Sequence, residues 1–320
     1  MPKLNMVQAI NLALKEEMQR DKNVVLLGED VGKDGGVFRI TEGLIDEFGA
    51  ERVIDTPLAE SVIAGAAIGM ALYGLKPVAE IQFMGFIYPA IDQIFSHASR
   101  IRSRSRGRFT CPLVIRAPYG AGIKAPELHS ESSEALFCHM PGIKVIVPSS
   151  PYNAKGLLIS SIRDPDPVIF LESTRQYRSI KEEVPEGEYT IPLGKARVVR
   201  EGSAVTLLAW GSMLHRTLQA IEDIDAEVID LMTLKPFDEE TMLKSVKKTG
   251  RVVIVHEAPK TCGFGAELSA TIAEDAMLYL KSPIIRVTGY DVVLPLPKLE
   301  DYYIPTAARI KKAIEEVMKY

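Results

Sequence analysis

Short runs of β-branched and other apolar residues alternate with helix-forming stretches along this chain, and no other feature limits its possible folds as strongly. In the first half the apolar runs cover residues 24–28, 77–81, 113–117, 144–147 and 168–171. Between them lie stretches of helical character at residues 6–20, 41–48, 58–73, 88–101 and 151–163. This alternation predicts an α/β fold, with a mostly parallel sheet flanked by helices on both faces.

The pattern breaks once and then starts again. Residues 181–194 are rich in charge and are interrupted by Pro185, Gly187 and Pro192, which indicates a connection between domains. Beyond it, apolar runs at 205–210, 226–231, 251–256 and 284–287 alternate with helical stretches near 215–221, 239–247 and 265–280. We therefore expect two domains, residues 1–180 and 195–320, with residues 181–194 as the linker.

Composition excludes several classes of protein. A net charge of -4 gives no reason to expect binding to nucleic acid or to an anionic membrane surface. The longest apolar run, residues 62–75, is too short to span a bilayer, and residues 4–20 have the polar interruptions of an amphipathic helix instead of an export signal. Cys111, Cys138 and Cys262 are widely spaced, which argues against disulfides or a zinc site and favours a cytoplasmic location.

One local charge pattern stands apart from this composition. Arginine occupies alternate positions from residue 100 to residue 108: Arg100, Arg102, Arg104, Arg106 and Arg108. Basic runs can bind phosphate or nucleic acid, but neither interleaved aromatic residues nor a recognisable nucleic-acid-binding motif accompanies this one. The pattern favours a solvated or subunit-facing loop.

Glu60 stands at the head of an otherwise small and apolar stretch. A carboxylate is normally excluded from such a segment unless it has a partner. Gly65 and Gly69 would share one helical face, where a second backbone could approach closely. Thr56 and Pro57 suit a helix cap and a first helical position, and the helix dipole favours an acid in a first turn. Glu60 is thus either a helix-capping residue or a carboxylate that reaches a cofactor across a subunit contact.

The loops expected after the strands carry the other candidate residues. Parallel sheets of this type bind ligands outside the carboxyl ends of their strands. The loops there, at residues 28–36, 55–60, 82–86 and 117–133, are rich in glycine and acids. The last of them holds His129, which is either a proton shuttle or a surface histidine. Phosphate-binding glycine loops, nucleophile elbows and His-Glu-x-x-His motifs do not occur in the sequence.

Eight segments together resemble the β subunit of the thiamine-diphosphate-dependent 2-oxo acid dehydrogenases, the decarboxylating components that act on pyruvate or branched-chain 2-oxo acids. They are Gly-Glu-Asp-Val-Gly at 28–32, Thr-Pro-Leu-Ala-Glu at 56–60, Glu-Ile-Gln-Phe at 80–83, Pro-Ala-Ile-Asp-Gln at 89–93, Glu-Leu-His-Ser at 127–130, Pro-Gly-Ile-Lys-Val at 141–145, Ala-Lys-Gly-Leu at 154–157 and His-Glu-Ala-Pro at 256–259. Glu60, with Gly65-Ala66 and Gly69-Met70, also resembles the wider signature of thiamine diphosphate pyrimidine domains. The resemblance implies a pyrimidine-binding domain followed by a transketolase C-terminal-like domain.

The same resemblance implies roles for individual residues. Glu60 would hydrogen-bond a ring nitrogen of the aminopyrimidine, because a carboxyl in a nearly dry site can share its proton with such a nitrogen. Leu58, Gln82 and Phe86 would line the aminopyrimidine pocket, with Phe86 stacked on the ring. Some relatives carry tyrosine in place of Phe86, so one possible hydrogen bond is missing. His129 would transfer protons during reductive acylation of the lipoyl group.

Further expectations concern ions and partners. Potassium-binding positions of some relatives correspond to Leu113, Val114, Ser161, Asp164 and Asp166, although the set is not identical. The cofactor diphosphate and Mg²⁺ need a Gly-Asp-Gly segment, which this chain lacks; in the family a separate α subunit supplies it. We therefore expect a heterotetramer of two α and two β chains that is active only with α. Asp291 and Tyr320 lie where relatives engage the lipoyl acyltransferase core, or are an ordinary acid and chain end.

Three other functions remain as alternatives. The chain could be the C-terminal part of a split transketolase-like enzyme, an acetoin dehydrogenase β subunit, or an assembly subunit without chemistry. The Glu-Leu-His-Ser and Glu-Ile-Gln-Phe segments favour a 2-oxo acid dehydrogenase, and the presence of Glu60 and His129 argues against a loss of chemistry. Pyruvate and branched-chain substrates differ by a few methylenes, each worth only about 1–3 kcal/mol in such a pocket. The sequence gives a slight preference for branched-chain or broad use.

Overall fold

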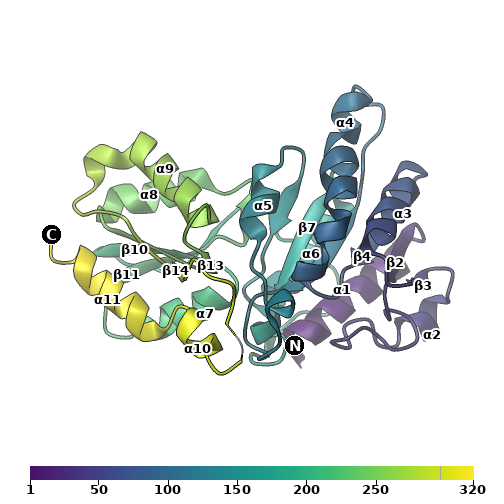
Figure 1. The fold of residues 1–320 in the computed structure, drawn as a ribbon, viewed down its shortest axis with the longest axis horizontal. Coiled ribbons are helices and arrows are strands. Elements are labelled where there is room, and N and C mark those ends of the chain that lie inside the picture. Colours follow the sequence, from purple (N-terminus) through teal and green to yellow (C-terminus); the bar gives the residue numbers. More distant parts are fainter. Residues whose placement is uncertain (296) are drawn as a thin grey trace.

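Two α/β halves lie side by side in the computed structural model, which describes residues 1–295 and 297–320 (Figure 1). The N-terminal half, drawn from purple to teal, contains a seven-stranded sheet, and the C-terminal half, drawn from green to yellow, contains a five-stranded sheet. Among the described residues, no helix is both long and apolar enough to cross a membrane. The predicted fold class, two mostly parallel sheets flanked by helices, is confirmed.

The first sheet has the strand order β12-β6-β7-β5-β4-β2-β3. Its strands are β2 (Val24–Gly28), β3 (Val53–Asp55), β4 (Lys76–Glu80), β5 (Val114–Tyr119), β6 (Lys144–Ile146), β7 (Val168–Ser173) and β12 (Thr233–Lys235). All neighbours are parallel except β12, which pairs antiparallel with β6. Since β12 comes from the C-terminal half of the chain, the second half contributes an edge strand to the first sheet.

Alternate residues of the strands separate the two faces of this sheet. Leu26, Val78 and Val114 pack in one hydrophobic cluster with α1 (Met6–Arg20) and α6 (Pro151–Arg163). Leu27 and Ala79, their neighbours in sequence, pack in another cluster with α3 (Glu60–Leu72). Helices thus cover both faces, as period-two burial of parallel strands requires. The remaining helices of this half are α2 (Leu44–Phe48), α4 (Ile101–Arg104) and α5 (Glu134–His139).

Two expected helices differ from the prediction. The capping role assigned to Thr56 and Pro57 is wrong, because α3 begins at Glu60 and its N-cap, Ala59, makes no side-chain hydrogen bond. The single helix expected over residues 88–101 is instead a 3₁₀ turn at Tyr88–Ala90, a π-helical turn at Gln93–His97 and a 3₁₀ turn at Ala98–Arg100, followed by α4. Turns of such mixed winding often mark functional segments.

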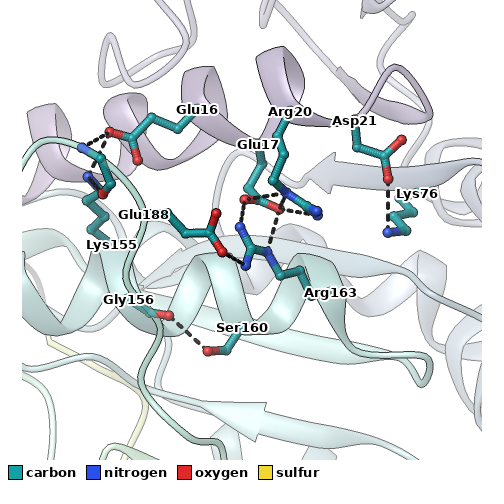
Figure 2. Close-up of polar contacts among 11 residues, drawn as sticks. Glu16, Glu17, Arg20, Asp21, Lys76, Lys155, Gly156, Ser160, Arg163 and Glu188 are labelled. Carbon is teal, nitrogen blue, oxygen red and sulfur yellow. Dashed lines mark hydrogen bonds and ion pairs between the residues drawn. The ribbon is translucent and has the colours of Figure 1, made fainter.

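The segment predicted to be the linker, residues 181–194, is fixed to the first half by polar contacts (Figure 2). Lys155 on α6 is fully buried, and its ammonium donates to Glu16 Oε1 at 2.8 Å and to the carbonyls of Pro185 and Gly187 at 2.7 and 3.0 Å. Arg163 on the same helix pairs with Glu17 and with Glu188 of the linker. In addition, β8 (Glu182–Glu183) pairs with β1 (Lys3–Leu4).

The second sheet has the order β14-β13-β10-β11-β9. Its strands β10 (Val205–Ala209), β11 (Ala226–Asp230), β13 (Val252–Pro259) and β14 (Ile285–Gly289) are parallel, and β9 (Arg197–Arg200) is an antiparallel edge. The helices of this half are α7 (Ser212–Ala220), α8 (Glu239–Thr249), α9 (Phe264–Ala276), α10 (Glu300–Tyr303) and α11 (Ala307–Val317). One hydrophobic cluster includes residues of both halves, such as Tyr119, Trp210 and Phe264.

Candidate active site

The predicted site residues follow the carboxyl ends of adjacent strands in the first sheet. Gly28 at the end of β2 is in register with Asp55 at the end of β3 and with Glu80 at the end of β4. Glu80 is in turn in register with Arg116 of β5. The loops that carry Glu29, Glu60, Gln82 and His129 therefore leave one edge of the sheet, where ligands of parallel sheets bind.

Glu60 is the first residue of α3 and lies beside a second acid. It is half-buried in this chain. The pKa of Glu29 is raised, chiefly by burial and further by the charges of Asp30 and Glu60. Leu58, predicted to line the pocket, is 71% exposed, and Val62 in the first turn of α3 is 61% exposed. The side of the site formed by the start of α3 is therefore open in a single chain.

The other side of the site is an aromatic cluster. The ring of His129 lies edge-on to Phe83 and Phe86, with centroid distances of 4.6 and 5.0 Å. Gly85 makes this contact possible, since an added Cβ there would lie 2.2 Å from the carbonyl oxygen of Leu128. Within the described part of the chain, the buried Nδ1 of His129 has no hydrogen-bond partner. The structure thus brings Phe86 and His129 into contact.

Gln82 connects the acidic and aromatic sides. Its amide donates to Asp30 Oδ2 at 3.2 Å, while its neighbour Phe83 belongs to the aromatic cluster. Glu29 and Asp30 were not assigned a role from the sequence, although they occur in the Gly-Glu-Asp segment directly after β2. The signal that could have identified them is the position of two acids at a strand end.

A buried ionic network lies beneath these loops. The guanidinium of Arg116 donates to both oxygens of Glu172, at 2.7 and 2.8 Å, and to Glu80. The hydroxyl of Tyr177 donates to Glu172 at 2.8 Å. All four side chains are buried. The network joins β4, β5 and β7, so it fixes the strands from which the loops with Gln82 and His129 emerge.

The site is an exposed edge in this chain, not a closed cavity. A cavity of about 650 Å³ does occur between the halves, where α5, the start of α8 and the start of α9 meet, and its walls include Cys138 and Cys262. Its lining contains neither Glu60, Gln82 nor His129. The residues around Glu60 therefore lie on an open surface and do not line this cavity.

The residues at the predicted potassium positions lie at the start of β5 and around the end of α6. The Leu113 carbonyl accepts from the amide of Val168, and the Ser161 hydroxyl donates to the carbonyl of Leu157. The carboxylates already have cationic partners: Asp164 pairs with Lys144 at 2.6 Å and Asp166 with Arg102 at 2.6 Å. Val114 is the first residue of β5. Potassium binding at these residues stays a prediction.

The predicted docking residues lie on the surface of the second half. Asp291 is exposed, and its carboxylate accepts from the amide and the hydroxyl of Thr261, both at 2.8 Å. These hydrogen bonds lower the pKa of Asp291. Tyr320 is 63% exposed at the chain end. Both are accessible, and Asp291 also has a local structural role in holding its loop.

Comparison with protein families assigns each half of the chain. Residues 2–179 match the family "Transketolase, pyrimidine binding domain" and residues 194–310 match "Transketolase, C-terminal domain". A solved structure described as "Split gene transketolase, inactive beta4 tetramer" has the same fold, with a TM-score of 0.82 over 99% of both chains. Its sequence identity of 24% supports a likeness of fold alone.

Curated relatives are similar over the full length of the chain. The chain is 49% identical to a pyruvate dehydrogenase E1 component subunit beta of Acholeplasma laidlawii, over 99% of this chain and 98% of the relative. It is 48% identical to the corresponding subunit of Bacillus subtilis, over all of both chains. It is 52% identical to the mitochondrial 2-oxoisovalerate dehydrogenase subunit beta of Dictyostelium discoideum, over 99% of this chain and 87% of the relative.

Proposed function

Because the chain belongs to the thiamine-diphosphate-dependent family of 2-oxo acid dehydrogenase β subunits, we propose that it forms the pyrimidine side of a cofactor site shared with an α subunit. The complete site would carry out the oxidative decarboxylation of a 2-oxo acid and the reductive acylation of lipoyl groups. The observation that carries this proposal is the arrangement at the edge of the first sheet. Glu60, next to Glu29, stands at one side, and Phe86 and His129 are in contact at the other.

Each residue has a task that follows from its chemistry. Thiamine diphosphate, when bound, supplies a nucleophilic carbon. The carboxyl of Glu60 holds a proton against a ring nitrogen of the aminopyrimidine, a role that needs a site closed to water. Gln82 and Leu58 line the pocket, and Phe86 provides a face for the ring. His129, with an unshared Nδ1 among the described residues, donates or accepts a proton as the lipoyl sulfur reacts.

Partners and ions complete the proposal. The half-exposed Glu60 and the 71% exposed Leu58 suggest that another chain covers the start of α3. An α subunit would hold Mg²⁺ and the diphosphate, in an assembly of two α and two β chains. The lipoyl acyltransferase core would dock near Asp291 and Tyr320. Potassium would bind at residues 113–114, 161, 164 and 166, and the complex would act in the cytoplasm.

The substrate is a branched-chain 2-oxo acid or pyruvate. Identities of 52% to a 2-oxoisovalerate enzyme and 48–49% to pyruvate enzymes support both, with branched-chain substrates slightly ahead. The test combines the chain with its α partner, thiamine diphosphate and Mg²⁺, and follows acceptor reduction with pyruvate, three branched-chain 2-oxo acids and acetoin. Turnover only with α supports the shared site. Substantial turnover without α, or none in a complex that binds cofactor, contradicts the proposal.

Substitution of Glu60 tests its chemical role directly. Glu60→Gln keeps the shape of the side chain but cannot exchange a proton at this position. We expect the rate of acceptor reduction to fall by about 10²–10⁴-fold, the range for loss of a positioned acid or base, in a complex of unchanged mass. Ser61→Ala, at the next and exposed position, is the matched control. A loss below tenfold for Glu60→Gln would assign Glu60 a structural role.

A further inference from the structure

The loop that carries His129 is closed at its base. The amide of Gly120, directly after β5, donates to the carbonyl of Glu131 at 2.8 Å. Inside the loop, the amide of His129 donates to the carbonyl of Pro126 at 3.0 Å. The loop belongs to the first half of the chain, but most of the side chains that hold its ends belong to the second half.

Glu257, near the end of β13, binds the start of the loop. Its fully buried carboxylate accepts from the backbone amide of Ala121 through one oxygen and from the hydroxyl of Ser212 at 3.1 Å through the other. Gly120 has φ of +82°, and an added Cβ would lie 3.1 Å from Glu257 Oε1. Glycine is therefore needed here both for the backbone conformation and for the approach of the carboxylate.

Glu300, the first residue of α10, binds the middle of the loop. Its carboxylate is 1% exposed and accepts from the backbone amide of Lys124 at 3.0 Å. Its other oxygen lies 3.8 Å from the guanidinium of Arg175. Arg175 packs against Gly122, where an added Cβ would lie 2.9 Å from the arginine side chain. Charge-assisted bonds to backbone amides of this kind are stronger than neutral ones.

Trp210 binds the far end of the loop. Its indole Nε1 donates to Glu134 Oε1 at 3.3 Å, and Glu134 is the first residue of α5.

The side chains that hold the loop lie at one edge of the second sheet. Trp210 follows β10, and Glu257 lies near the carboxyl end of β13, the parallel neighbour of β10. The chain leaves β10 towards β11 on one side and returns to β13 on the other. In doubly wound sheets, this point of reversal is where ligands bind. Here it receives the loop of the first half.

We propose that Glu257 and Glu300 are positioning residues for His129. The edge of the second domain where ligands usually bind would then hold the loop whose His129 transfers a proton in the lipoyl reaction. This proposal rests on the role of His129 given above. A loop of twelve residues (120–131) with two glycines has many conformations in the absence of such anchors. Removal of the Glu257 carboxylate leaves the backbone amide of the buried Ala121 without its partner. Removal of the Glu300 carboxylate takes away the acceptor of the Lys124 amide.

The size of the effect follows from the geometry that proton transfer needs. A displacement of about 1 Å in a reacting group can reduce its rate about 10²-fold. Glu257→Met and Glu300→Met retain side-chain volume but accept no hydrogen bond. We expect each to lower acylation of a lipoyl domain about 10–100-fold in the reconstituted complex. Decarboxylation followed with an artificial electron acceptor, which needs no lipoyl group, should fall less than about threefold.

The matched control and the rescue separate positioning from general stability. Glu227→Met removes another buried acid of the second domain, one that lies on β11 away from the loop and pairs with Lys248 on α8. It should change neither the rate of lipoyl acylation nor the rate of decarboxylation. Glu257→Gln and Glu300→Gln retain an accepting oxygen and should recover most of the acylation rate. Hydrogen exchange of the amides of residues 120–133 in the complex should accelerate for the two Met variants only.

His129→Ala separates failure of this inference from failure of the proposed function. If His129→Ala loses lipoyl acylation selectively but both Met variants acylate normally with unchanged loop exchange, the positioning role is wrong. The same conclusion follows if the Met variants lose both activities equally. If His129→Ala acylates normally, the function proposed for His129 is wrong, and the inference that rests on it is overturned with it, even where loop exchange has accelerated.

Discussion

Acids of the first sheet and its loops occupy contrasting environments. Glu60 is half-buried, as expected of a residue that another chain or a cofactor would cover. Glu80 and Glu172 are buried within the chain and share one guanidinium, that of Arg116. Burial raises the pKa of Glu80, while Arg116 opposes that rise. A buried carboxylate is tolerated only with such a partner, so Glu80 and Glu172 have a structural role, whereas the role proposed for Glu60 is chemical.

Arg116 should therefore be essential for stability. Arg116→Met fills a similar volume but leaves Glu80 and Glu172 buried without their cation. We expect the free energy of unfolding to fall by about 3–5 kcal/mol, as for other broken buried pairs, measured by denaturant titration. The control is Arg102→Met, which removes a pair whose arginine side chain is 47% exposed and should cost less than about 1 kcal/mol. Equal effects of the two substitutions would refute the role of burial.

Glu134 should make stability depend on pH. Burial raises its pKa from an ordinary value of 4.5 to about 7, opposed by the hydrogen bond from Trp210 and reinforced by Glu257. Tyr119 and Cys138 also lie near its carboxyl. Because the folded state binds the proton more tightly, this stabilisation is full below pH 4.5 and is lost as pH rises through about 7.

Glu134→Gln cannot ionise, and its amide oxygen can still accept from Trp210. The variant should match the native chain near pH 4.5 and exceed its stability at pH 8 by at most about 3 kcal/mol, given about 1.4 kcal/mol per pKa unit. Thermal melting of both proteins at the two pH values measures the difference. Asp230, whose pKa is also raised by burial to about 7, is common to both and cancels. A difference that does not change with pH would contradict the expected titration.

At the scale of elements, long periodic segments could be predicted and short edge segments could not. The bounds of α1, α6 and β2 agree with the prediction, because α1 and α6 have side-chain caps at Asn5 and Ser150 and β2 is buried throughout. Strands β9 and β12 have four and three residues and pair antiparallel at sheet edges, too short for a periodic signal.

The candidate site shows the same limit. Glu60, Gln82 and His129 lie in segments whose residue order carries the resemblance, and Phe86 lies between two such segments, so all four could be selected from the sequence. The contacts of the His129 loop with Glu257 and Glu300 join positions 136 and 176 residues apart. No local pattern encodes such a distant pairing.

The linker provides a prediction about an element. Lys155→Met removes three hydrogen bonds from α6, one to Glu16 on α1 and two to the carbonyls of Pro185 and Gly187. We expect faster cleavage in the linker, at Glu186 and Glu188, by a glutamate-specific protease, and a loss of about 3–5 kcal/mol of unfolding free energy. Lys195→Met, which removes a 60% exposed lysine 3.8 Å from Asp238, should change neither. Cleavage at the native rate would show that the linker does not depend on Lys155.

At the scale of the whole molecule, the two halves are not independent. Strand β12 of the second half pairs with β6 of the first, through Thr233 opposite Ile146. The loop of His129 is held by the second half, and one hydrophobic cluster includes both. The exposed surface of the first half includes the outer face of α3, with Val62 at 61%, Leu72 at 42% and Tyr73 at 89% exposure. Small and apolar residues on such a face suit close contact with another helix.

Gly69, on this face of α3, tests whether the face packs against another chain. An added Cβ at Gly69 meets nothing within 4 Å, and glycine within a helix is less stable than alanine by about 1 kcal/mol. Gly69→Ala should therefore raise the stability of the isolated chain by up to about 1 kcal/mol, and Gly69→Leu should not lower it. If the face packs closely in the complex, Gly69→Leu should weaken association with α at least about tenfold, because the larger side chain separates the helices. The mass of the complex is measured by light scattering, and the affinity by titration of the chain with the α subunit. The control is Ala270→Leu, at an exposed position of α9. Native affinity for Gly69→Leu would place the subunit contact elsewhere and leave the small residues of α3 without a role in assembly.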